Sequence, residues 1–288
     1  MLLTDSKFIK KLEMLSMLAR KVLNGELKAD RKSQKKGSGT TFADYQEYFP
    51  GDDYRNIDWN IAGRLGQLVI KLFELEEDLQ LHIFIDISHS MTTKLPLAKE
   101  LTAALAYIAL HNNDRITIYG LSEKLETLLK PSHGKGKIFP MLDTLQKQKA
   151  ADGINKFSDC IKHFQTRRPK KGLCVVLSDF LIEDDYSAGL DMLRWAGHDV
   201  FAIQILDKEE LDCSIKGEFE LQCNETQRKR RVTISKDMLE RYRALLQEWN
   251  ETLQQNCVSR EIGLVQTNSD ESFEYIIQNI LRKGGLVA

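Results

Sequence analysis

Three oxygen-bearing side chains follow a long apolar run in the first half of the chain. The run covers residues 79–85 and ends on Asp86, and Ser88 and Ser90 come next at two-residue steps. If the run is a buried strand, these three side chains converge beyond its end. Ligand sets made only of oxygen suit a hard divalent cation, Mg²⁺ before Mn²⁺ or Ca²⁺. The spacing therefore predicts a metal-dependent recognition site.

The same residues have a purely structural alternative. Asp and Ser at a strand-to-helix turn satisfy free amide groups at the start of the helix. A second acid, Asp179, follows another apolar run, residues 173–177, and an acid there is also common in turns. Strand ends at one edge of a parallel sheet are neighbours, so Asp86 and Asp179 can meet at that edge.

The elements that must position these acids alternate along the chain. We expect strands at 79–85, 116–121, 173–177, 200–206 and 263–266, and helices at 95–111, 136–147, 157–166, 186–196, about 238–253 and 272–281. Near-continuous apolar strands that alternate with helices predict an α/β fold. Its sheet would be doubly wound and mainly parallel, with helices on both faces and ligands bound beyond the carboxyl ends of the strands.

Further segments flank this expected core. The sequence predicts an amphipathic helix at 5–23, a basic surface loop, a dense irregular stretch at 42–65 and a strand at 68–73. Two strands around a polar turn, at 218–222 and 231–234, would form a small β insertion at about 211–234. We therefore expect residues 1–74 to be an N-terminal helix and segment that pack on the core, and residues 75–288 to be the α/β domain.

Composition excludes several classes of function. The chain has 288 residues, a net charge of −1, 42% hydrophobic and 29% charged residues, which is ordinary for a globular protein and gives no pull toward nucleic acid or anionic membranes. The longest uncharged stretch, 13 residues at 101–113, is too short to cross a bilayer. Charges also interrupt the N-terminus, which does not resemble a signal peptide. Five cysteines without a Cys-x-x-Cys pair indicate reduced thiols and a cytoplasmic location.

A second block of residues is more specific than the strand-end motif. It reads Gly37-Ser38-Gly39, Phe42-Ala43-Asp44-Tyr45, Glu47-Tyr48, Pro50-Gly51-Asp52-Asp53-Tyr54-Arg55-Asn56-Ile57-Asp58-Trp59 and Arg64. Asp86-x-Ser88-x-Ser90 and the later Leu177-Ser178-Asp179-Phe180 resemble the metal-ion-dependent adhesion site of von Willebrand factor A domains. Together, over nearly the whole chain, these features resemble a bacterial von Willebrand factor A-like family, domain of unknown function 58.

The resemblance implies a particular set of metal ligands. Asp86, Ser88 and Ser90 would be joined by a Thr from a middle loop and by a second Asp, at the position of Asp179. Two carboxylates would neutralise Mg²⁺, and hydroxyl groups and waters would complete its octahedron. The family's Thr falls on Asn155. Its carbonyl oxygen could bind through water, or the change could weaken the site, with Ser158 as a substitute one helical turn later.

The resemblance also implies a binding adaptor. The metal would dock an Asp or Glu side chain of a partner, and members of the resembled family are commonly linked with MoxR-type AAA+ ATPases in maturing or assembling proteins. The candidate partner-binding residues are Asp52, Asp53, Arg55, Asp58 and Trp59. The alternative for this block is a partly buried network in which Arg55 and Arg64 pair with nearby acids and pin the segment to the sheet.

An enzyme is the competing class of protein. Asp86 could serve a metal-dependent hydrolase or phosphotransferase, but an aspartyl-phosphate enzyme needs a second acid two residues after its nucleophile, where this chain has Ser88. The sequence has no Gly-x-Ser-x-Gly motif and no histidine spacing typical of zinc. Its basic runs lack the interleaved aromatic residues of nucleic-acid binders. We therefore expect a protein that is not an enzyme and binds no nucleic acid.

Overall fold

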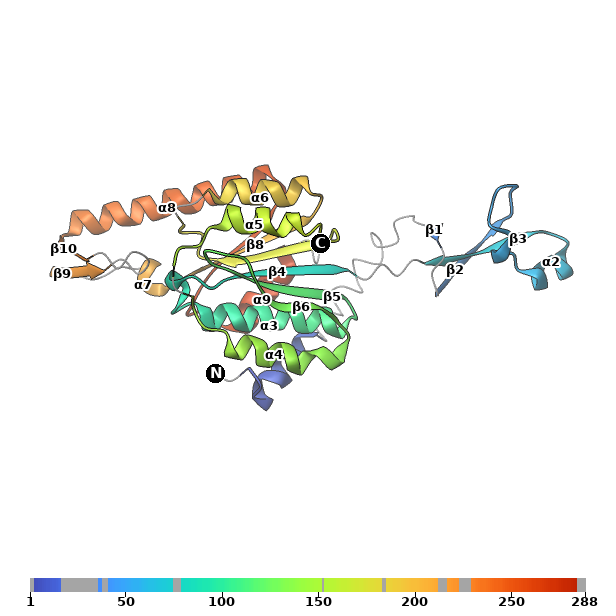
Figure 1. Ribbon diagram of the computed structural model, residues 1–288, viewed down its shortest axis with the longest axis horizontal. Coiled ribbons are helices and arrows are strands. Elements are labelled where there is room, and N and C mark those ends of the chain that lie inside the picture. The colour runs from blue at the N-terminus through green and yellow to red at the C-terminus, as the bar shows by residue number, and fades with distance from the viewer. Residues whose placement is uncertain are drawn as a thin grey trace. The chain divides into compact units, whose positions relative to one another are not determined.

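The computed structural model describes residues 3–16, 36–37, 41–74, 79–151, 153–182, 185–211, 217–222 and 229–283. The chain divides into two units. The larger unit joins Met1–Glu26 to Leu79–Ala288, and the smaller unit is Leu27–Asp78. Figure 1 shows the elements of both units.

A six-stranded sheet forms the centre of the larger unit. Its strands are β4 (Gln80–Asp86), β5 (Arg115–Leu121), β6 (Glu126–His133), β7 (Leu173–Ser178), β8 (Asp199–Leu206) and β11 (Gly263–Asn268). They lie in the order β11-β8-β7-β4-β5-β6, and every neighbouring pair is parallel except β5 and β6. Counted along the chain this is the doubly wound order 3-2-1-4-5-6, which reverses between β4 and β7. The predicted fold class is confirmed.

Helices cover both faces of this sheet. One face carries α3 (Leu95–His111), α4 (Ile138–Lys147) and α9 (Phe273–Lys283), and the other carries α5 (Phe157–Thr166), α6 (Tyr186–Trp195) and α8 (Lys236–Ser259). Strand β4 shows why its sequence is apolar throughout. Ile83 and Ile85 belong to one buried cluster and Phe84 to the other, because successive side chains of a strand point to opposite faces.

The N-terminal helix belongs to the larger unit. Residues 6–16 are helical, and the rest of the helix predicted at 5–23 lies outside the described residues, except for Asp5, which forms a bend. Phe8, Leu12 and Leu15 are buried in the same cluster as α3 and α9, and the Phe8 and Phe273 rings lie 5.6 Å apart. The boundary therefore differs from the one we expected, since this helix groups with the α/β domain rather than with residues 27–78.

The smaller unit contains elements that the sequence did not reveal. The stretch expected to be irregular contains strand β2 (Thr41–Glu47), a short 3-10 helix (Tyr54–Asn56) and helix α2 (Trp59–Leu65). Strand β2 pairs antiparallel with β3 (Val69–Glu74), which also pairs with β1 (Lys36–Gly37). Whether this unit packs on the α/β core stays a prediction.

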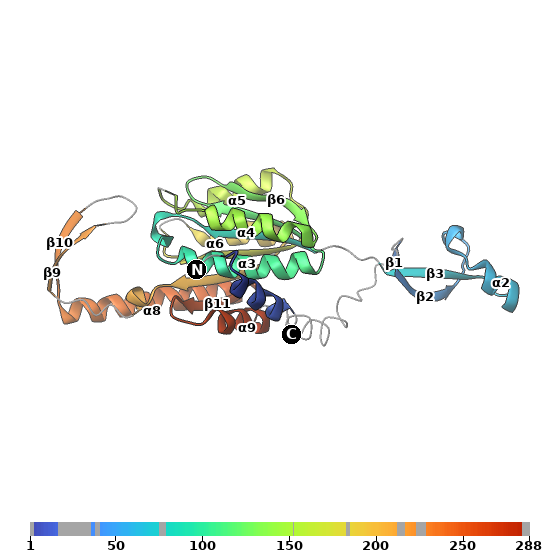
Figure 2. The ribbon, with the colours of Figure 1, turned by 90° about the horizontal axis from the view of Figure 1, so that it is seen from below.

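Two further strands complete the description. The hairpin of β9 (Gly217–Gln222) and β10 (Lys229–Ile234) is antiparallel, as the sequence predicts, and Figure 2 shows it at the start of α8.

Strand β6 was not predicted. It is an edge strand whose side chains are half-buried or exposed, so it has no buried face to create an apolar alternation, and it accommodates Pro131 as edge strands can.

The buried histidines of the sheet generate a prediction on stability. The rings of His82 and His198 lie 5.6 Å apart, and burial lowers the pKa of both imidazoles. The pKa of a histidine in an unfolded chain is about 6.5. As the pH falls through this value, the two imidazoles take up protons in the unfolded chain more readily than in the folded protein. We expect the free energy of unfolding to fall as pH drops from 7.5 to 5.5, by up to about 1.4 kcal/mol per histidine and pH unit.

Urea unfolding at the two pH values measures this effect. His82→Gln removes one titrating group, so its stability should fall less with pH than that of the wild type. His133→Gln changes an exposed histidine and should keep the wild-type fall. An unchanged pH dependence in His82→Gln would show that the buried imidazole is not responsible.

Candidate functional site

Asp86 lies at the centre of the predicted site. It ends strand β4 and is fully buried. Its Oδ1 atom accepts hydrogen bonds from Ser88 N (2.9 Å) and Ser88 Oγ (2.6 Å). Its Oδ2 atom accepts from Ser178 Oγ (2.7 Å) and Asn155 Nδ2 (2.7 Å). Ser90 joins through a 3.1 Å contact between its hydroxyl and that of Ser88. The structure thus brings Asp86, Ser88, Ser90 and Asn155 together.

The electrostatics of this carboxyl group are unfavourable for a bare charge. Burial raises the pKa of Asp86, and the negative charge of Asp179 raises it further, while the hydrogen bonds from Ser88 and Ser178 act in the opposite direction. A buried carboxylate with a raised pKa gains most from a cation that neutralises it. Hydrogen bonds alone do not supply that charge.

Asn155 supplies the test of whether a cation fits. Its Oδ1 atom is buried and has no hydrogen-bond partner among the described residues. An amide oxygen in that state carries a desolvation cost that a cation or an ordered water removes. Asp86, Ser88, Ser90 and Asn155 therefore form an oxygen-only set that suits Mg²⁺. The described residues contain no group of three or more His, Cys, Asp and Glu side chains that could hold a metal, so a site here depends on hydroxyl and amide oxygens.

Asp179 has a different partner from the one we expected. It follows β7 and is buried. Its Oδ1 atom accepts from Leu181 N (3.0 Å), and its Oδ2 atom accepts from Lys94 Nζ (2.8 Å). Lys94 also donates to Glu210 Oε1 (2.6 Å). The structure therefore places Asp179 beside an ammonium group, and its predicted role as a metal ligand stays a prediction.

Lys94 and Glu210 are residues that the sequence analysis missed. The Lys94 side chain has no exposed surface. Burial acts to lower the pKa of Lys94, but the charges of Asp179 and Glu210 outweigh it, so the pKa is raised and the group stays charged. Lys94 thus forms a buried ion pair with Asp179 and a second ion pair with Glu210.

A strained residue fixes the turn after β7. Phe180 has φ 55°, a left-handed conformation that costs a bulky residue on the order of 1–3 kcal/mol. Three contacts hold it there: its N–H donates to Ser178 Oγ (3.0 Å), its carbonyl accepts from Trp249 Nε1 (3.0 Å), and its ring packs on Tyr186. Because Phe180 lies between Asp179 and Leu181, this strain is stored at the site itself.

Ser158 is not placed as the substitute that we considered. Its hydroxyl donates to the backbone carbonyl of Asp185 (2.7 Å), whereas Asn155 contacts Asp86. The middle-loop position closest to the expectation is therefore Asn155.

The predicted partner-binding residues all lie in the smaller unit. Asp52 accepts from Phe49 N (3.0 Å), and Trp59 is 67% exposed. Asp58 caps α2 and pairs with Lys71 (2.9 Å), which lowers the pKa of that carboxyl group. Arg55 pairs with Asp53 (2.9 Å), but its side chain is 76% exposed. Arg55 thus pairs with a nearby acid, as the alternative predicts, and the partly buried network that would pin the segment to the sheet stays a prediction.

Comparison with known proteins identifies the family. The model of the family described as "Protein of unknown function DUF58" matches residues 44–252, so the chain belongs to this family. "Uncharacterized protein Mb1516" of Mycobacterium bovis and "Uncharacterized protein Rv1480" of Mycobacterium tuberculosis are each 24% identical over 226 residues, which are 76% of this chain and 71% of theirs.

Solved structures give more distant likenesses. The conserved hypothetical protein BatB from Bacteroides thetaiotaomicron has a TM-score of 0.45 at 16% identity, covering 72% of this chain and 99% of that one. Proximal thread matrix protein 1 from the mussel byssus, in a structure described as having a zinc occupied MIDAS motif, has a TM-score of 0.41 at 13% identity, covering 71% and 46%. Among the described residues, no helix has the length and hydropathy needed to span a membrane.

The buried ion pair yields a prediction on stability. Lys94→Met leaves the buried carboxylate of Asp179 without its ammonium partner, so we expect the free energy of unfolding to fall by about 3–5 kcal/mol. The double variant Lys94→Met/Asp179→Asn removes both charges and should regain much of that loss. Lys162→Met breaks an exposed pair with Asp159 and should change little. Chemical denaturation distinguishes these outcomes, and a Lys94→Met protein as stable as the wild type would contradict the pairing.

Proposed function

We propose that this member of the DUF58 family is a cytoplasmic protein-binding adaptor whose site at the ends of β4 and β7 docks an acidic side chain of a partner. The observation that carries this proposal is the amide oxygen of Asn155, which has no hydrogen-bond partner in the described part of the chain and belongs to a side chain that contacts the buried carboxyl group of Asp86. Neither group has a cationic partner among the described residues. Both groups lie at the switch point of a doubly wound sheet, where such folds bind ligands.

In this proposal, the metal would be held by Asp86, Ser88, Ser90 and Asn155. Asp179 would contribute its negative charge to the site. When bound, Mg²⁺ would offer an exchangeable position to the carboxylate of a partner. The chain's own residues prepare that position. Ser178 and the Ser88 amide orient the Asp86 carboxyl group, and the contact between the Ser88 and Ser90 hydroxyl groups holds the two oxygens together.

Binding rather than catalysis is the function we propose. An aspartyl-phosphate enzyme needs a second acid two residues after its nucleophile to protonate the leaving group. Here that residue is Ser88, which is not an acid and whose hydroxyl donates to the Asp86 carboxyl group. This favours a recognition site over the alternative of a metal-dependent hydrolase or phosphotransferase.

A MoxR-type AAA+ ATPase is the partner we propose, in the maturation or assembly of other proteins. This part of the proposal comes from the family resemblance. The smaller unit offers a suitable surface, because the large side chains of Tyr54 and Trp59 are 68% and 67% exposed beside the charged residues Asp53 and Arg55. Exposed aromatic and arginine side chains are typical anchors of protein interfaces.

Calorimetric titration of Mg²⁺ and Mn²⁺ into chelator-treated protein tests the metal site. We expect the wild type to bind and Asp86→Asn to bind at least tenfold more weakly, because the buried charge that attracts the cation is lost. Asp143→Asn removes the same charge from an exposed position of α4 and should bind like the wild type. Failure of the wild type to bind either ion, or equal binding by Asp86→Asn, would reject the metal site.

Purified MoxR-type ATPase from the same genome tests the partner. We expect its affinity for the wild type to fall in Asp86→Asn and in Trp59→Ala, and to depend on Mg²⁺. An ATPase that does not bind the wild type would reject this partner while leaving the metal titration as it stands.

A further inference from the structure

The carboxylate of Glu210 reaches into the site from a short helix. Helix α7 (Lys208–Leu211) follows strand β8. Glu210 Oε1 lies 2.6 Å from Lys94 Nζ, and Glu210 Oε2 accepts from Asp207 N at 2.7 Å. The Glu210 side chain is 29% exposed, whereas those of Lys94 and Asp179 are 0% and 1% exposed. Glu210 is therefore the member of this cluster that solvent can reach.

Charge counting shows that Glu210 is not needed to neutralise the buried ammonium. Lys94 and Asp179 already form a neutral pair in the interior, and breaking a buried pair is costly. Glu210 adds a second carboxylate on the solvent side, where ion pairs contribute much less. Another carboxylate could therefore replace Glu210 on Lys94 without uncovering a buried charge.

Several contacts fasten α7 over this position. The Thr93 hydroxyl pairs with the Asp207 carboxylate, which ties the segment to the residues just before α3. The Tyr242 hydroxyl donates to the Glu210 carbonyl oxygen (2.9 Å), which ties it to α8. Displacing the Glu210 side chain would remove its contacts with Lys94 Nζ and Asp207 N, which would leave α7 and Asp207 with the Thr93 and Tyr242 contacts and loosen the segment.

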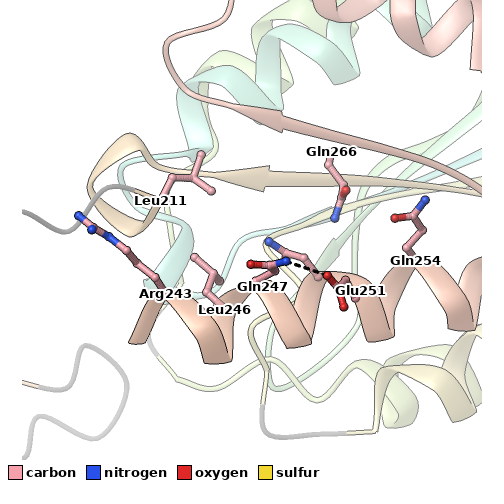
Figure 3. Close-up of a pocket in the computed structure, with 8 residues that line it drawn as sticks. Leu211, Arg243, Leu246, Gln247, Glu251, Gln254 and Gln266 are labelled. Carbon is pink, nitrogen blue, oxygen red and sulfur yellow. Dashed lines mark hydrogen bonds between the residues drawn. The ribbon is translucent and has the colours of Figure 1, made fainter. Parts of the chain in front are cut away.

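Movement of α7 would change the shape of a pocket beside it. Its volume is about 300 Å³, and Figure 3 shows Leu211 of α7 and Gln266 of β11 lying opposite residues of α8. The α8 residues that line it include Arg243, Leu246 and Gln247. Leu211 is the residue after Glu210, so movement of α7 changes one wall of the pocket.

We infer that the Lys94 ammonium is a carboxylate receptor, that Glu210 is its built-in occupant, and that a second acidic side chain of the docking partner takes the place of Glu210. This rests on the proposed function, since it adds a position for another acid of the same partner beside the one that Mg²⁺ would offer. The ligand class is an Asp or Glu side chain, because the receptor already holds a carboxylate at hydrogen-bond distance. Docking would then loosen α7, whose backbone Tyr242 of α8 contacts at the Glu210 carbonyl oxygen.

A blocked glutamate, N-acetylglutamate N-methylamide, is the probe for the test, and the corresponding blocked glutamine is its uncharged control. We would titrate both into the wild type, Glu210→Gln and Glu209→Gln, with and without a chelator, and follow the backbone amide resonances. Glu209→Gln makes the same charge change at an exposed position of the same helix. Amide hydrogen exchange over residues 207–211 gives a second readout in the same variants.

We expect Glu210→Gln to bind the blocked glutamate at least fivefold more tightly than the wild type and Glu209→Gln do, and the blocked glutamine to bind none of them. Exchange over residues 207–211 should be at least fivefold faster in Glu210→Gln. No gain in affinity, no binding by any variant, or unchanged exchange would each overturn the inference.

The chelator separates this inference from the proposed metal site. A gain in Glu210→Gln that persists in chelator supports the Lys94 receptor even if the Mg²⁺ titration fails. Asp86-dependent Mg²⁺ binding without any gain in Glu210→Gln would leave the metal site standing and reject the receptor.

Discussion

The fold is organised around one buried carboxyl group that the interior must compensate. Asp86 ends the central strand β4 without any exposed surface. Its donors come from three separate places: Ser88 in the turn after β4, Ser178 at the end of β7, and Asn155 in the loop before α5. A buried acid is tolerated only when such donors are in place. Satisfying Asp86 therefore requires that the sheet and both loops adopt their native positions together.

The two acids at the switch point are compensated in different ways. Asp179 receives a full positive charge from Lys94, whereas Asp86 receives only hydrogen bonds from neutral groups. Adjacent strand ends thus carry one neutralised carboxylate and one that is not. Burial and the negative charge of Asp179 raise the pKa of Asp86, and the hydrogen bonds from Ser88 and Ser178 act in the opposite direction.

The helices and strands whose apolar residues recur at a regular spacing could be predicted from the sequence. Helices α3 and α5 begin and end where the pattern places them, because an amphipathic or buried element shows its burial in its residues. Asp86, Ser88 and Ser90 are local in sequence, so their convergence could be predicted as well. Asn155 was assigned through the family resemblance, and its contact with Asp86 depends on a loop that spacing alone does not position.

Lys94 could not be predicted, because nothing local distinguishes it from a surface lysine. It follows two threonines in a polar turn, and its ion-pair partners Asp179 and Glu210 lie far from it in the sequence. Strand β6 and the strands of the smaller unit were difficult for a related reason. Few of their described side chains are buried, so backbone pairing defines them rather than an apolar face.

A polar network extends the site across the sheet. Gln204 of β8 is fully buried, and its Nε2 atom donates to the Asp179 carbonyl oxygen (3.1 Å) and to Asn250 Oδ1 of α8 (3.0 Å). Gln266 of β11 donates to Gln204 Oε1 (2.8 Å), and both Asn250 and Gln266 line the pocket of Figure 3. Because Trp249 of α8 also holds the Phe180 carbonyl, helix α8 contacts the turn after β7 directly and through Gln204. Hydrogen bonds of the folded protein therefore link both Asp179 and α7 to α8.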